Sequence, residues 1–108
     1  FRPFNFGSSD PVRRSHAIQY IAHPDWPWDR LRQEKPDQYE SRVTPEPQAN
    51  DWCRLKVVFG EKRVQAFVND SEQPSLDVPR LSDTEAGSVG LWFNGIAEFK
   101  NFRVTNLQ

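Results

Sequence analysis

The side chains most able to do chemistry in this sequence are aromatic, amide and basic, and most of them precede residue 45. Aromatic rings stack on the apolar faces of a ligand, and planar polar side chains form hydrogen bonds with its hydroxyl groups. The candidate binding residues are Arg2, Asn5, Gln19, His23, Trp26, Trp28, Arg32, Tyr39, Trp92 and Asn94. On one concave sheet face, with residues 23–35 as a rim loop, they would form a carbohydrate cleft.

Each tryptophan also has a structural interpretation. Trp26 and Trp28 could fold with Leu31 over one end of the molecule as a small satellite core. We expect Trp52 to pack in the core, whereas strand parity turns Trp92 away from its apolar neighbours and towards a second face. The aromatic residues therefore divide between packing and binding, and only their positions in the fold decide between the two.

Hydrolysis of a glycosidic bond generally needs two carboxylates, about 5–5.5 Å apart for retention and about 6.5–9.5 Å apart for inversion. Glu40 is the best single candidate for a general acid or base, and His23 or Asp25 could accompany it. The alternative is that Glu40 forms an ion pair on its strand face with Arg32 or Arg42.

Other chemistries lack their motifs. No nucleophile elbow and no phosphate-binding loop is present. His16 and His23 are an odd number of residues apart, so strand alternation places them on opposite faces, and we expect no metal site. We also expect no cofactor. The one cysteine, Cys53, cannot form an internal disulfide and is interpreted as a small core residue.

Charge and hydropathy exclude two classes of partner. There are 14 basic and 15 acidic residues, giving a net charge of −1, so binding to nucleic acid through its phosphates is not expected. The mean hydropathy is −0.80, and no apolar run approaches the roughly 18 residues that would span a membrane. The single cysteine leaves the compartment open, since extracytoplasmic proteins need not use disulfides. We expect an extracytoplasmic location, either periplasmic or secreted.

The elements that would position these residues are short strands. Alternating apolar residues predict strands over 1–6, 14–22, 38–43, 52–59, 63–69, 76–78, 89–94 and 97–105. Residues 23–37 are irregular because of their prolines, with one helical turn over 28–33. Gln19 lies mid-strand, where it could contact a ligand or face solvent. This spacing of strands and turns predicts an antiparallel β-sandwich or barrel.

The second half has the clearest pattern. The chain turns at residues 60–62 between two alternating segments, which predicts a hairpin. Asn94-Gly95 predicts another hairpin between the last two strands. The residues expected to point inward are Cys53, Leu55, Val57, Phe59, Val64, Ala66 and Val68.

Four segments carry a resemblance to known proteins: WCRLKVVF at 52–59, VQAFVN at 64–69, GSVGLWF at 87–93 and AEFKNFRVT at 97–105. In this order they resemble the C-terminal half of concanavalin A-like lectin/glucanase jelly rolls, including laminin G-like modules and the 3-keto-disaccharide hydrolase family. The resemblance covers roughly residues 50–107. The paired acids of the retaining glucanases, Glu-x-Asp-x-x-Glu, are absent from this sequence.

The resemblance implies an all-β fold, an antiparallel sandwich of the concanavalin A-like jelly-roll type. Residues 1–108 would be one such domain, or the C-terminal part of a larger one with N-terminal strands missing here. We expect a carbohydrate-binding module, non-catalytic or attached to a glycan-degrading enzyme. The alternatives are a glycan-active hydrolase with Glu40 in its site, and an assembly domain that forms homo-oligomers through a sheet edge.

Overall fold

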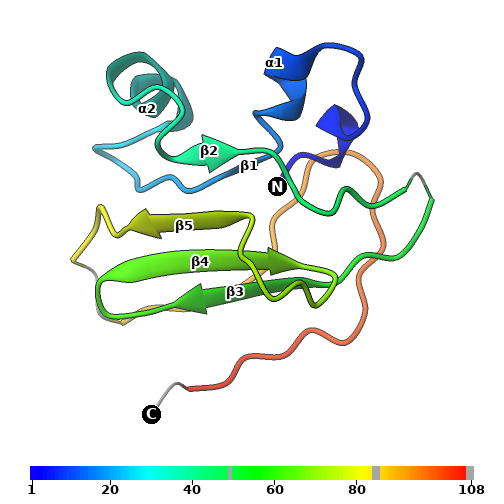
Figure 1. Cartoon of the computed structure of the whole chain (residues 1–108). Coiled ribbons are helices and arrows are strands. Elements are labelled where there is room, and N and C mark those ends of the chain that lie inside the picture. The colour runs from blue at the N-terminus through cyan, green and yellow to red at the C-terminus, as the bar shows by residue number, and fades with distance from the viewer. Residues whose placement is uncertain (49, 84–85, 107–108) are drawn as a thin grey trace.

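Two antiparallel sheets and three short helices make up the computed structural model, which describes residues 1–48, 50–83 and 86–106. In chain order the elements are the 3-10 helix η1 (Pro3–Asn5), α1 (Pro11–Arg14), β1 (Ile18–Gln19), α2 (Trp28–Glu34), β2 (Glu40–Ser41), β3 (Leu55–Phe59), β4 (Arg63–Val68) and β5 (Leu76–Pro79). One layer contains β1, β2 and the helices, and β3, β4 and β5 form the sheet beneath it (Figure 1).

The three-stranded sheet has the order β3-β4-β5, with Val57 opposite Ala66 and Ala66 opposite Leu76. The predicted hairpin between the segments 52–59 and 63–69 is confirmed, and so is the short strand around residues 76–78. After β4 the chain turns through Asn69 and Asp70, which both have positive φ. Asn and Asp tolerate this conformation better than most residues, and this is why the turn falls there.

The core lies between the two layers. The three-stranded sheet contributes Val64, Ala66, Val68, Leu76 and Val78, and the upper layer contributes Ala17, Ile18, Leu31, Tyr39 and Val43. The predicted inward direction of Val64, Ala66 and Val68 is therefore confirmed. The predicted helical turn over 28–33 is α2, which is attached to this core by the fully buried Leu31.

The predicted strand over residues 1–6 is wrong, because η1 occupies Pro3–Asn5. The predicted strand over 14–22 shortens to Ile18–Gln19, and α1 precedes it. The side chain of Asp10 accepts a hydrogen bond from the backbone N–H of Val12, and Pro11 occupies the first helical turn. This cap and proline favour a helix start, and they outweigh the alternation of apolar residues.

The predicted strands over 89–94 and 97–105, with their Asn94-Gly95 hairpin, are also wrong. The segment 86–106 contains no strand in the described part of the chain. Its apolar side chains are largely exposed, and so is Trp52. The β3 residues Leu55, Val57 and Phe59 are exposed too, although they lie on the core-facing side of the sheet. The predicted core position of Trp52 is therefore wrong. The fold is small and β-rich, with two antiparallel sheets.

Candidate functional site

The site is built around a buried carboxylate on β2. The side chain of Glu40 is 2 % exposed, and Arg32 of α2 holds it in a bidentate ion pair. Arg32 Nε donates to Glu40 Oε1 at 3.0 Å, and Arg32 Nη2 donates to Oε2 at 3.2 Å. His16 Nδ1 contacts Oε1, and Arg2 Nη1 lies 3.9 Å from Oε2. A buried carboxylate needs such partners, because an unpaired buried charge is strongly destabilising.

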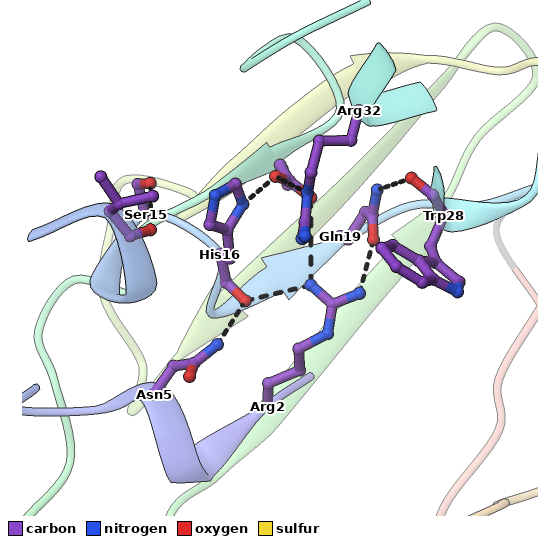
Figure 2. A network of polar contacts seen from close by, with 9 residues as sticks. Arg2, Asn5, Ser15, His16, Gln19, Trp28 and Arg32 are labelled. Carbon is purple, nitrogen blue, oxygen red and sulfur yellow. Dashed lines mark hydrogen bonds and ion pairs between the residues drawn. The ribbon is translucent and has the colours of Figure 1, made fainter. Parts of the chain in front are cut away.

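Arg2 is fixed by acceptors on β1 and just before it. Its Nη1 donates to the backbone oxygen of His16 at 3.1 Å, and its Nη2 donates to Gln19 Oε1 at 2.7 Å (Figure 2). Asn5 Nδ2 donates to the same oxygen of His16 at 3.0 Å, and Gln19 Nε2 donates to the backbone oxygen of Trp28 at 3.3 Å. The network therefore joins the N-terminal segment, β1 and α2.

The electrostatics of Arg2 reflect this crowding. Burial lowers the pKa of Arg2, the charge of Glu40 acts in the opposite direction, and the charge of Arg32 lowers it further. Both effects that lower the pKa penalise a cation that is taken from water and placed beside another cation. The carboxylate of Glu40 therefore interacts with several basic groups at once, and Arg2 is only one of them.

Short local elements bring these side chains together. β1 and β2 pair with Gln19 opposite Glu40, so the amide and the carboxylate come from neighbouring strands. Trp28 and Arg32 lie four residues apart on α2, which places them on the same face of the helix. The Arg32 guanidinium lies 5.1 Å from the centroid of the Trp28 ring.

A hollow of about 470 Å³ opens above this network. It is lined by Arg2, Phe4, Asn5, Arg13, His16, Trp28 and Arg32. Trp28 is 50 % exposed, so part of its ring is accessible to a ligand. The lining combines aromatic surface with fixed N–H donors, which is the combination that recognises a polar ring.

Six of the predicted site residues meet in or beneath this hollow: Arg2, Asn5, Gln19, Trp28, Arg32 and Glu40. Of the two ion-pair partners considered for Glu40, the structure contains Arg32, whereas Arg42 binds Glu46. The hollow is formed by the layer of short helices and short strands and not by a broad concave sheet.

The other predicted site residues lie elsewhere. Tyr39 is buried in the core beside Tyr20, with ring centroids 6.2 Å apart, and burial raises its pKa. Trp26 packs against the core, and its ring lies 4.3 Å from the Arg30 guanidinium. This position agrees with the structural interpretation of Trp26. His23 does not line the hollow.

Trp92 and Asn94 belong to the C-terminal segment and also do not line the hollow. The Trp92 side chain is 88 % exposed. The sequence patterns placed both residues on a strand, and their separation from the other candidates follows from the absence of that strand in the described segment 86–106.

Three lining residues were not among the sequence candidates: Phe4, Arg13 and His16. His16 was considered only as a metal ligand, yet it lies two residues before β1, and β1 pairs with the strand that carries Glu40. Pairing the segments 14–22 and 38–43 would have placed His16 near this acid. Nothing in the sequence distinguishes Arg13 from its neighbour Arg14.

The polar side chains that line the hollow are mainly hydrogen-bond donors. Within the described residues the lining contains no carboxylate, and both oxygens of Glu40 contact basic groups. A glycosidase pair needs a second carboxylate near the first. The described part of the chain also holds no cluster of three or more His, Cys, Asp or Glu residues with metal-ligand geometry.

No protein-family model, curated protein or solved structure matches the chain. Among the helices of residues 1–48, 50–83 and 86–106, none has the length and apolar character needed to cross a membrane.

Proposed function

We propose that the chain is a non-catalytic carbohydrate-binding module and that the hollow above Glu40 is its binding site. The observation that carries this proposal is the half-exposed Trp28 ring beside the guanidinium donors of Arg2 and Arg32, which Gln19 and Glu40 hold in place. The ring stacks on the C–H face of a sugar, and the donors bind its oxygen atoms.

Trp28→Ala tests this function, because it removes the stacking surface from a side chain that is half exposed. We expect it to abolish oligosaccharide binding measured by isothermal titration calorimetry. Trp92→Ala is the matched control, since Trp92 is also exposed but lies outside the hollow. Binding that depends on Trp92 and not on Trp28 would refute the location of the site.

The hydrolase alternative has a direct test. Glu40 would be its acid or base, so Glu40→Gln would abolish turnover of a glycan substrate while the folded variant still binds it. The single carboxylate beneath the hollow supports a binding module instead. The concanavalin A-like sandwich and the extracytoplasmic location stay predictions. The hairpin of β3 and β4 supports the sandwich, whereas the described segment 86–106 contains neither of the last two strands that the resemblance implies.

The exposed side of β3 favours a second function, assembly with another copy of this chain. The accessible surface is 8603 Å². A compact monomer of 12.6 kDa exposes roughly 6,200 Å². The excess is well above the roughly 800 Å² that each partner buries in a stable interface. The chain therefore exposes more surface than a compact monomer of its mass, and the apolar side chains of β3 and of segment 86–106 are part of this surface.

We propose that β3 pairs antiparallel with β3 of a second copy, with Val57 at the twofold axis. Beyond β4, the strand β3 pairs with no other strand of the described chain, so its outer edge has unpaired backbone groups. In this register Leu55 faces Phe59 of the other copy, and Lys56 faces Val58. No like charges oppose one another within the strand, and the apolar face continues across the axis.

Val57→Lys tests this assembly, because it would place two positive charges opposite each other at the axis. We expect sedimentation equilibrium to show a dimer for the native chain and a monomer for the variant. Val12→Lys is the control, since Val12 is also exposed and lies on α1 in the other layer. A native chain that stays a folded monomer up to the highest concentration that sedimentation can measure would refute the assembly, because dimerisation increases with protein concentration.

A further inference from the structure

The hollow above Glu40 contains more positive than negative charge. Arg2, Arg13 and Arg32 line it, and the one carboxylate of the network is Glu40. Three guanidinium groups against one carboxylate leave two positive charges that this carboxylate does not balance. The chain as a whole has a net charge of −1, so this excess is a local property of the hollow.

The acceptors of Glu40 are already occupied. Arg32 takes both of its oxygens, and His16 Nδ1 contacts one of them. Arg2 is farther away, at 3.9 Å, and its hydrogen bonds go to neutral oxygens of His16 and Gln19. The charge of Arg2 is therefore only partly compensated by Glu40.

Arg13 has no ion pair in the described part of the chain. It stands on α1, is exposed, and lines the hollow. Glu46, which pairs with the adjacent Arg14, is also bound by Arg42. Arg13 is therefore the side chain most available to an incoming anion.

We infer that the hollow selects acidic sugars, in which a carboxylate or a sulfate ester is carried on the sugar ring. This inference rests on the proposed carbohydrate-binding function and specifies the class of ligand that the module binds. The planar guanidinium of Arg matches the geometry of both anions. Arg13 and Arg2 bind the anionic group, while the ring of the same sugar stacks on Trp28.

The test compares oligosaccharides that differ in charge. Calorimetry with the full chain would use an oligogalacturonide, its fully methyl-esterified form, a neutral cello-oligosaccharide and a sulfated carrageenan oligosaccharide. We expect an acidic ligand to bind at least tenfold more tightly than the uncharged ones, and its affinity to fall as salt is added. The oligogalacturonide and the sulfated arm show which of the two anions is recognised.

Arg13→Gln connects this preference to the hollow. We expect it to weaken binding of the acidic ligand about fivefold or more and to weaken binding of uncharged ligands by a clearly smaller factor. Arg54→Gln is the matched control, because Arg54 is an exposed arginine that pairs with Asp70 away from the hollow. Circular dichroism would verify that both variants fold.

The outcomes separate the two proposals. Equal binding of acidic and neutral oligosaccharides would overturn the inference and leave the carbohydrate-binding function intact. An acidic preference that Arg13→Gln does not change would also overturn it. If none of the four oligosaccharides binds the folded chain, the proposed function fails as well.

Discussion

The carboxylate of Glu46 should make the stability of this protein depend on acid pH, and Glu46→Gln measures how much. The Glu46 side chain is 15 % exposed and accepts hydrogen bonds from Arg14 and Arg42 and from the backbone N–H of Gly7. The bond from Arg14 is the largest cause, and together these donors lower the pKa of Glu46 from 4.5 to about 2. These hydrogen bonds connect Gly7, which follows η1, with α1 and with the segment after β2.

The magnitude follows from the two pKa values. A carboxylate at about 2 in the folded state and 4.5 in the unfolded state corresponds to at most about 3 kcal/mol of unfolding free energy. Water screens part of this, because the Arg42 side chain is 54 % exposed. We therefore expect about 1–2 kcal/mol at pH 7.

The sign follows from the direction of the shift. Because the folded pKa is lowered, the stabilisation is complete above about pH 5 and disappears as the pH falls towards 2. Urea unfolding at pH 7 and at pH 3 would measure it. Glu46→Gln should be about 1–2 kcal/mol less stable than the native chain at pH 7, and this difference should fall by about half at pH 3.

A control and a refuting result complete this experiment. Glu61→Gln alters an exposed acid in the turn between β3 and β4, and we expect its effect to stay below about 0.5 kcal/mol at both pH values. An equal loss of stability for Glu46→Gln at pH 7 and at pH 3 would refute the reasoning. The charge of Glu46 would then not be the source of the stabilisation.

Two further predictions concern buried polar chemistry. Glu40→Gln leaves the guanidinium of Arg32 without its buried counterion, and we expect urea unfolding to show a loss of about 3 kcal/mol; a loss below about 0.5 kcal/mol would contradict the network. Burial raises the pKa of the Cys53 thiol, so less thiolate is present in the folded chain. We expect iodoacetamide at pH 8 to alkylate it several times more slowly than in 8 M urea, and equal rates would contradict this.

The sequence predicted the hairpin of β3 and β4 well because strand alternation and a turn are local properties. The same alternation correctly identified which side of β3 shares the face of Val64 and Ala66. It could not show whether anything covers that side, since covering depends on elements distant in sequence. Leu55 and Val57 lie on the predicted side of the sheet, yet they are exposed.

The candidate site was predicted only in part for a similar reason. Arg32 and Glu40 are eight residues apart, and their ion pair was one of two considered from the sequence. Arg2 joins them from 38 residues away, and its position depends on the hydrogen bond between its backbone N–H and the carbonyl oxygen of Ala17. Residue types indicate which side chains can form such a network, but the pairing of β1 with β2 determines which ones meet.

The bonds that hold Arg2 and Arg32 lower the entropic cost of the proposed ligand binding. A free arginine side chain loses about 2 kcal/mol of rotamer entropy when it is immobilised. Glu40 and Gln19 restrain these two side chains as the chain folds, so a ligand meets donors that are already oriented. Among the described residues no ion pair holds Arg13, so in the proposed module a bound anion would order its side chain. In the proposed module the hollow therefore combines two arginines that are already oriented, Arg2 and Arg32, with Arg13, which can adjust to anions at different positions on a sugar ring.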